Sequence, residues 1–139
     1  MKIRPYADAD QADVVALWQA CALTRPWNDP LKDIARKQSI QAEWFLVGKL
    51  GGAVIASVMF GYDGHRGWMN YLAVAPEHQG QGHAKALIAQ GEVLLLAAGC
   101  PKISLLVRRS NAQVLGFYEA LGYGQDDVVS LGKRLIPDH

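Results

Sequence analysis

Apolar residues near the start of the chain follow the spacing of a helix face. Between Asp8 and Ala22 they recur every three or four residues. They are Val14, Leu17, Trp18 and Cys21. Asp8 followed by Gln11 has the form of a capping box, so we expect a helix over residues 9–22. Residues 2–6, KIRPY, predict a short strand before it.

A connector with two prolines separates this helix from a second one. The sequence LTRPWNDP, residues 23–30, excludes one continuous helix, because proline lacks the backbone N–H that a helix interior needs. Asp29 can cap a second helix and Pro30 can open it. We expect that helix over residues 31–39.

Three apolar runs joined by short turns follow the two helices. They cover residues 44–50, 53–62 and 68–74. The links Gly51-Gly52 and Asp63-Gly64 are two-residue turn signals, since glycine reaches positive φ at little cost. We therefore expect three antiparallel strands.

The third of these runs leads through a glycine turn into a helix. Residues 71–74 are apolar, Pro76 breaks the run, and Gly80 and Gly82 precede a helical pattern over residues 84–98. The first backbone N–H groups of such a helix have no carbonyl partner, and glycine lets an anion approach them closely. The arrangement favours phosphate binding. The alternative is an ordinary tight turn.

The last third of the chain predicts a strand, a helix and a final strand. Residues 103–107 are continuously apolar, which is typical of a strand buried on both faces and parallel to its neighbour. We expect a helix over residues 111–121 and a final strand or hairpin over residues 128–136. The order of elements predicts a mixed α/β fold in a single domain, residues 1–139.

The composition narrows the functional classes. Half of the residues are hydrophobic and the formal net charge is +1, which gives no reason to expect nucleic acid or a membrane as partner. No apolar stretch approaches the ~18 residues of a membrane span, and the first residues lack the pattern of a secretion signal. Cys21 and Cys100 lie outside any metal-binding spacing. We expect a reduced, cytoplasmic protein without a metal site.

Two motifs resemble those of the Gcn5-related N-acetyltransferase (GNAT) family. Residues 79–84 read QGQGHA, of the form QxxGxA, and do not match the GxGxxG or GxxxxGK patterns of nucleotide-binding loops. Residues 111–123, NAQVLGFYEALGY, resemble the second motif, in which Asn111 opens a helix and Tyr118 stands one turn before Gly122. The two motifs in this order are more specific than either alone.

The resemblance implies the fold and the cosubstrate. In the acyl-CoA N-acyltransferase (GNAT) fold, helices flank a central, mostly antiparallel sheet, and one parallel strand pair splays apart. Here the splayed strands would carry Val74 and Val107, with the thioester of acetyl-CoA in the gap. Acetyl-CoA would be the cosubstrate, and no metal is implied. The implied cofactor-binding residues are Leu72, Ala73, Val74, Gln79, Gly80, Gln81, Gly82, His83, Ala84, Lys85 and Asn111.

The second motif also implies a catalytic acid. By the resemblance, Tyr118 protonates the leaving thiolate of coenzyme A, which a phenol can do within hydrogen-bond reach. The alternative is a half-buried core aromatic. Several family members carry glutamates at positions occupied here by Trp68 and Leu106, neither of which accepts a proton. We expect direct attack by the amine in a ternary complex, with water or a polar side chain as the base.

The acceptor site is the least defined by the sequence. In the resembled family the connector between the first two helices borders it, which makes Trp27, Asn28 and Asp29 candidates. Trp27 alternatively only covers the core. Asp63 and His65, in the Asp-Gly turn, are further candidates for the substrate site. Asp63, His65 or Asp29, or a water chain, could supply the base. The acceptor would be an amine of a small molecule, or a protein N-terminus or lysine. The oligomeric state stays open, with a homodimer among the alternatives.

Three further segments resemble one subgroup of the family. RPWNDP, GYDGHRG and SLGKRLI look like the small bacterial YpeA-like acetyltransferases, which implies no particular acceptor. VRRSNAQVLGFYEALGY also resembles enzymes that acetylate protein N-termini. The competing class is a coenzyme A binding or sensing module without turnover, which the missing carboxylates favour. Release of the thiol in the presence of an amine separates the two classes.

Overall fold

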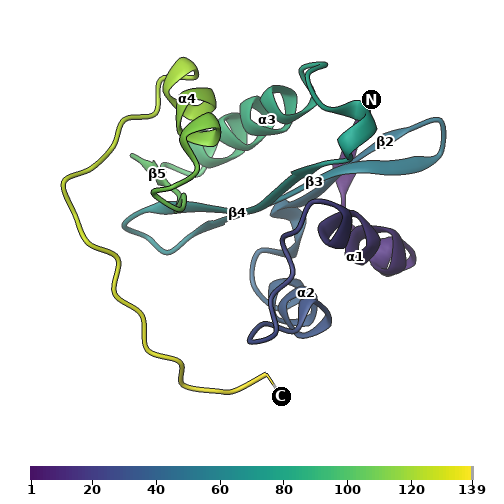
Figure 1. The fold of residues 1–139 in the computed structure, drawn as a ribbon, viewed down its shortest axis with the longest axis horizontal. Helices are drawn as coiled ribbons and strands as arrows, with labels where there is room; N and C mark the ends of the chain where they lie inside the picture. Colours follow the sequence, from purple (N-terminus) through teal and green to yellow (C-terminus); the bar gives the residue numbers. More distant parts are fainter. Residues whose placement is uncertain (139) are drawn as a thin grey trace.

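The computed structural model describes residues 1–138 and contains a five-stranded sheet with helices on both faces (Figure 1). The strands follow one another across the sheet in chain order. They are β1 (Lys2–Pro5), β2 (Phe45–Leu50), β3 (Ala53–Tyr62), β4 (Gly67–Val74) and β5 (Ile103–Ser104). Neighbours from β1 to β4 are antiparallel, whereas β4 and β5 are parallel. The expected mixed α/β fold, mostly antiparallel with one parallel pair, is confirmed.

The helices lie in two layers (Figure 1). Helices α1 (Gln11–Ala20) and α2 (Pro30–Gln38) cover one face, and α3 (His83–Ala97) and α4 (Ala112–Ala120) cover the other. Three short 3-10 helices are η1 (Asp8–Asp10), η2 (Ala42–Trp44) and η3 (Pro76–His78). Within residues 1–138, no helix is both long and apolar enough to cross a membrane.

The core fills the space between the sheet and both helix layers. On the α1 side, the buried rings of Trp18 and Phe45 stack with centroids 6.2 Å apart. On the α3 side, Leu87 and the ring of Phe60 are buried. Gly91 allows α3 to approach β3 closely, because a Cβ at this position would overlap the Phe60 ring.

Capping and turn residues correctly predicted most of the boundaries of the helices and strands. The Leu31 N–H donates to Asp29 Oδ1 at 2.9 Å, which confirms Asp29 as the cap of α2. Both hairpins turn at glycines of positive φ, as at Gly51 (58°) and Gly64 (93°). The cap before α1 differs from the expected one. Asp10, not Gln11, accepts the N–H of Ala7 at 2.9 Å.

A kink in β4 follows from a buried chain of hydrogen bonds. The indole N–H of Trp18 donates to the Ser57 hydroxyl at 2.9 Å, and this hydroxyl donates to the Tyr71 carbonyl at 3.0 Å. Tyr71 has a positive φ of 54°, and the β3–β4 register shifts between Ser57 and Met59. The kink therefore marks a β-bulge just before the end of β4.

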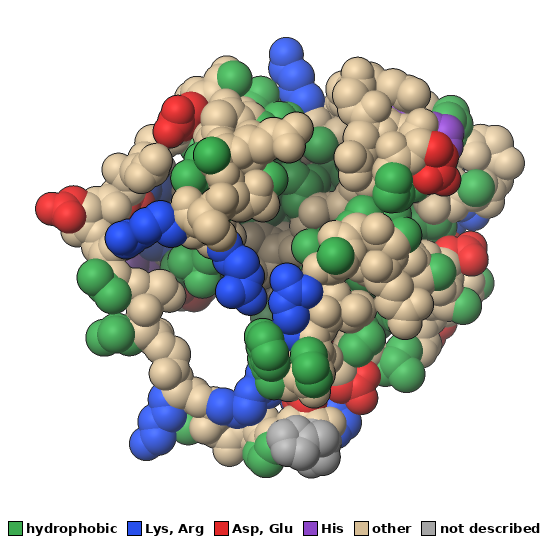
Figure 2. Space-filling view, viewed as in Figure 1, with side chains coloured by type: hydrophobic (Ala, Val, Ile, Leu, Met, Phe, Trp, Pro, Cys, Tyr) green, Lys and Arg blue, Asp and Glu red, His purple; other side chains and the backbone are tan. Residues whose placement is uncertain are grey.

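The end of the chain departs from the sequence-based expectation. Residues 124–138, here called the C-terminal segment, contain no strand, so the expected strand or hairpin over residues 128–136 is wrong. The segment leaves α4, passes β5 and crosses to α2, which leaves an opening beside the body of the molecule (Figures 1 and 2). β5 is also shorter than residues 103–107. The sequence predicted a strand here, but it does not specify a partner for that strand within the chain.

Candidate active site

The parallel strands β4 and β5 separate part of the way along the sheet. Their pairing consists of Gly67 with Ile103 and Trp68 with Ser104, whereas β4 continues to Val74. Beyond Trp68, the edge of β4 that faces β5 therefore has no strand partner within residues 1–138. β5 ends as a strand at Ser104, so residues 105–109 no longer pair with β4. We call the space along this unpaired edge of β4 the gap.

The open edge of β4 presents backbone groups to this gap. The Ala75 N–H donates to the Ile55 carbonyl of β3, so by alternation the backbone groups of Leu72 and Val74 point the other way. The Val74 carbonyl accepts from Gln79 Nε2 at 3.0 Å, which ties the following turn to the strand. Ala73, opposite Ser57 in the register, faces β3. Leu72 thus presents both of its backbone groups to the gap, whereas Val74 presents only its N–H, because its carbonyl also accepts from Cys21 Sγ at 3.2 Å.

The turn between β4 and α3, here called the phosphate turn, covers residues 79–85. Gly80 and Gly82 have positive φ values of 76° and 86°, and Gly82 caps α3 without a side-chain hydrogen bond. The first main-chain bond of α3 runs from the Ala86 N–H to the Gly82 carbonyl, so the N–H groups before Ala86 have no carbonyl partner in the helix. A Cβ at either glycine would meet no atom within 4 Å. This open, positively polarised helix start fits a phosphate group.

Side chains of the phosphate turn lie at its surface. Lys85 is exposed on the first turn of α3, where its ammonium can add charge for an anion. His83 Nε2 lies 3.3 Å from Gln81 Oε1, and its ring is in edge contact with that of His78. Within residues 1–138, no group of three or more histidine, cysteine, aspartate or glutamate side chains could hold a metal ion.

Helix α4 carries the second motif toward the same gap. Asn111 caps the helix by accepting the Val114 N–H at 3.4 Å. Seven residues further on, Tyr118 is buried, and its hydroxyl lies 3.9 Å from the sulfur of Met69. Met69 directly follows the last residue of β4 that pairs with β5. The phenol therefore lies where the two strands part.

Burial further favours the neutral form of this phenol. It raises the pKa of Tyr118 to about 12, because the charged phenolate loses solvation. Tyr118 is thus a neutral hydrogen-bond donor throughout the physiological range.

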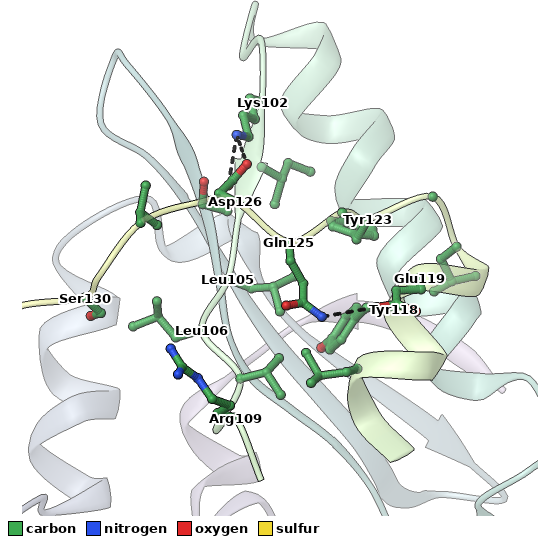
Figure 3. Close-up of a pocket in the computed structure, with 18 of the residues that line it drawn as sticks. Lys102, Leu105, Leu106, Arg109, Tyr118, Glu119, Tyr123, Gln125, Asp126 and Ser130 are labelled. Carbon is green, nitrogen blue, oxygen red and sulfur yellow. Dashed lines mark hydrogen bonds and ion pairs between the residues drawn. The ribbon is translucent and has the colours of Figure 1, made fainter. Parts of the chain in front are cut away.

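Tyr118 also lines a groove of about 710 Å³ beside β5 (Figure 3). Helix α4, residues 102–109 and the first part of the C-terminal segment form its walls. Lys102 Nζ bonds Asp126 at 2.9 Å, and Gln125 Nε2 donates to Glu119 at 3.3 Å (Figure 3). We call this space the β5 groove. Leu106, a position where family members carry a carboxylate, lies in its wall and is 70% exposed.

The connector before α2 meets the end of the C-terminal segment. Asp138 accepts the backbone N–H of Asp29 at 2.7 Å and bonds Arg36 Nη2 at 2.7 Å. Arg134 donates to Asn28 Oδ1. The Asp138 side chain is almost inaccessible, and the hydrogen bond from Arg36 lowers its pKa to about 2. Trp27, in the same connector, is half exposed.

A tyrosine–aspartate pair lies next to this connector and could not be predicted from the sequence. The Tyr71 hydroxyl donates to Asp33 Oδ2 at 2.6 Å, and its ring stacks on Trp18 with centroids 3.9 Å apart. Burial, followed by the Asp33 hydrogen bond, raises the pKa of Tyr71. The pair forms across 38 residues of sequence, so no local spacing signals it. It lies on the face of β4 that α1 and α2 cover.

The remaining two candidates lie away from the phosphate turn. Asp63 Oδ1 accepts the backbone N–H groups of His65 and Arg66, and these bonds lower the pKa of Asp63. Tyr62, beside them, donates to the Gly99 carbonyl just after α3. The phosphate turn is at the opposite end of this 15-residue helix, which is about 22 Å long. Asp63 and His65 therefore lie far from the phosphate turn.

Comparison with known proteins identifies the family of this chain. The sequence profile of the Acetyltransferase (GNAT) family matches residues 12–123. An acetyltransferase of Yersinia enterocolitica is 50% identical over 138 residues, covering 99% of this chain and 98% of the relative. The chain belongs to the GNAT acetyltransferase family. It is thus an acetyltransferase of a family that uses acetyl-CoA and acetylates amines of small molecules or proteins.

Solved structures share the fold at lower identity. The ribosomal-protein-S18-alanine N-acetyltransferase from Escherichia coli has a TM-score of 0.74 at 23% identity, over 90% of this chain and 78% of that chain. AAC(6')-Iy, in complex with the bisubstrate analogue CoA-S-monomethyl-acetylneamine, has a TM-score of 0.75 at 20% identity, over 96% and 97% of the two chains. At this identity the likeness shows the fold alone.

Proposed function

We propose that residues 1–139 act as one N-acetyltransferase domain, which transfers the acetyl group of acetyl-CoA to a primary amine by direct attack in a ternary complex. The observation that carries this proposal is the position of the Tyr118 hydroxyl, 3.9 Å from Met69 Sδ where β4 and β5 separate. An acid at this point can reach a thioester held in the gap.

The chain offers separate places for the two ends of acetyl-CoA. The pyrophosphate binds the free N–H groups and open glycines of the phosphate turn, with Lys85 beside it and Asn111 on the cofactor arm. The pantetheine arm follows the outward backbone groups of Leu72 and Val74. A backbone N–H of this edge then polarises the acetyl carbonyl, the usual device in acyl transfer.

The transfer step needs no covalent intermediate. The amine nitrogen bonds to the acetyl carbon, the carbon–sulfur bond breaks, and the sulfur takes the proton of the Tyr118 hydroxyl. The amine loses its proton to water. Bulk water then restores the proton of Tyr118, whose raised pKa favours the neutral form.

The acceptor approaches, in this proposal, from the side of the α1–α2 connector. Trp27, Asn28 and Asp29 border that side, and the Tyr71–Asp33 pair supplies a partly accessible carboxylate. A carboxylate attracts an acceptor that arrives as an ammonium. The acceptor class is a small-molecule amine, a protein N-terminus or a lysine.

The test follows thiol release from acetyl-CoA with a panel of amines and peptides. Wild type releases coenzyme A only when an acceptor is present, and Tyr118→Phe does so far more slowly. Tyr123→Phe is the matched control, because its hydroxyl lines the same groove but bonds Glu92 at 2.8 Å. Saturable coenzyme A binding without thiol release from any amine would instead support a binding module.

A further inference from the structure

The β-bulge in β4 changes which residues of this strand face the gap. Before the bulge, the Gly67 N–H donates to the Lys102 carbonyl at 2.8 Å, on the β5 side of the strand. Alternation along the strand therefore turns the backbone groups of Gly67 and Met69 toward β5. In a regular strand, Tyr71 would be the next residue to face this side.

The extra residue of the bulge reverses the alternation. Val58 is the single residue of β3 at the register shift, whereas β4 has Tyr71 and Leu72 opposite it. Beyond the shift, the backbone groups of Ala73 and Ala75 face β3, so those of Leu72 face the gap. The bulge thus gives the Leu72 N–H its direction.

The first residue of the bulge has a backbone conformation that tyrosine seldom adopts. Tyr71 has a φ of 54°, and a bulge with positive φ at this position usually has glycine there. A residue with a Cβ keeps this conformation only where the surrounding structure holds it. The contacts of Tyr71 therefore determine whether the bulge keeps its shape.

A buried hydrogen-bond chain holds the carbonyl of Tyr71. Ser57 Oγ donates to this carbonyl at 3.0 Å and accepts from the indole N–H of Trp18 at 2.9 Å. Ser57 and Trp18 are both fully buried. Because solvent does not reach them, loss of either hydrogen bond leaves a polar group without a partner.

The side chain of Tyr71 is held by the same helix layer. Its ring stacks on Trp18 with centroids 3.9 Å apart, and its hydroxyl donates to Asp33 at 2.6 Å. Trp18 thus contacts the Tyr71 ring directly and its carbonyl through Ser57. Neither Ser57 nor Trp18 is exposed to the gap, so any part they play in the reaction acts through Tyr71.

We propose that Ser57 and Trp18 are positioning residues of the transfer reaction. Their hydrogen-bond chain fixes the bulge at Tyr71, and the bulge directs the Leu72 N–H at the carbonyl oxygen of the bound acetyl group. Such a donor stabilises the charge that develops in the transition state most effectively when it is held in place beforehand. This inference rests on the proposed function, because it requires the acetyl group of acetyl-CoA to lie in the gap.

Infrared spectroscopy of acetyl-CoA isotopically labelled at the acetyl carbonyl carbon tests the contact without an acceptor. A hydrogen bond weakens the C=O bond, so we expect the enzyme-bound band at lower frequency than the band of free acetyl-CoA. Ser57→Ala should move the band back toward the free value. Trp18→Phe removes only the first hydrogen bond of the chain and should move it less. Val14→Ala is the matched control, because this buried apolar residue lies on the same helix as Trp18, and its band should equal that of wild type.

Kinetics with an acceptor separate positioning from stability. In Ser57→Ala we expect kcat to fall about ten- to a hundredfold, with coenzyme A affinity within about threefold of wild type, because the phosphates bind elsewhere. Val14→Ala should lower Tm without this loss of kcat.

Two results would overturn the positioning role. One is a wild-type band at the frequency of free acetyl-CoA, and the other is a band and kcat in Ser57→Ala equal to those of wild type. If Ser57→Ala does not fold, an unchanged band and kcat in Trp18→Phe have the same meaning. Thiol release that depends on Tyr118 would leave the proposed function standing in each case, whereas a wild type without thiol release would overturn both.

Discussion

The hydroxyl of Tyr118 lies 3.9 Å from the sulfur of Met69, the first residue of β4 beyond its pairing with β5. Helix α4 thus positions a neutral phenol at the point where the pairing of β4 with β5 ends. The sequence places these residues 49 positions apart, so only the fold brings them together.

Removing the phenolic hydroxyl should slow the chemical step. Tyr118→Phe keeps the buried ring and deletes the acid, so we expect kcat to fall about a hundredfold, with little change in coenzyme A affinity. Steady-state kinetics and calorimetric titration measure the two quantities, and Tyr123→Phe should leave kcat within a few-fold of wild type. Parallel losses of binding and melting temperature in Tyr118→Phe would indicate a structural tyrosine.

A negative charge in the phosphate turn should weaken cofactor binding. Gly82→Glu places a carboxylate against the expected pyrophosphate, so we expect coenzyme A affinity to fall more than tenfold, or about 1.4 kcal/mol. Gly51→Glu is the matched control, because this glycine also has positive φ and open space around it. Equal affinities in the two folded variants would remove the phosphate turn from the site.

The pH profile of kcat/KM should reflect the pKa of the acceptor amine and not that of a histidine. With Trp68 and Leu106 at the positions of the family carboxylates, we expect the rate to rise with pH and level off near the pKa of the amine. The raised pKa of Tyr118 keeps the acid protonated up to about 12, so no loss of rate is expected below pH 10. A low-pH inflection that disappears in His65→Ala would identify that histidine as the base.

The close approach of α3 to β3 should make Gly91 intolerant of a side chain. Gly91→Ala drives a methyl group into the Phe60 ring, so we expect a loss of about 1–3 kcal/mol in the free energy of unfolding. Gly116→Ala, in α4 with no atom within 4 Å, should instead stabilise by about 0.5–1 kcal/mol. Chemical denaturation measures both changes. A Gly91→Ala protein as stable as wild type would contradict the packing.

The contacts of the Asp138 carboxylate with Arg36 and the Asp29 N–H should weaken in acid. The pKa of Asp138 is lowered in the folded protein, so its contribution to stability is complete above the ordinary aspartate value near 3.8 and is lost as pH falls toward about 2. We expect Asp138→Asn to lower Tm at pH 7 and to match wild type near pH 2. A Tm difference that persists unchanged across this range would show that the Arg36 contact contributes nothing.

Features encoded by neighbouring residues could be predicted from the sequence. The Asp29 cap, the two hairpin turns and the glycine turn before α3 depend on local backbone preferences, and all lie where expected. The second motif placed Tyr118 on α4, although its distance from β4 required the structure.

Features that depend on distant partners could not be predicted. The first cap uses Asp10 and not the expected Gln11. The carboxylate of Asp10 is held by an ion pair with Arg4 of β1 at 2.7 Å. The Tyr71–Asp33 pair joins a strand to a helix across 38 residues. The strand expected over residues 128–136 is absent for the same reason, because the local sequence does not specify which chain or edge will pair with it.

Direct transfer from acetyl-CoA to the amine at Tyr118 can be tested by mixing the enzyme with acetyl-CoA before any acceptor is added. Intact-protein mass spectrometry and thiol detection follow the same sample. Direct attack predicts an unmodified protein and no thiol until the amine arrives, and then one thiol for each acetylated amine. The contrary result is a protein that gains one acetyl group and releases one thiol before the amine is added, and then transfers this acetyl group to the amine. That result would rule out direct attack.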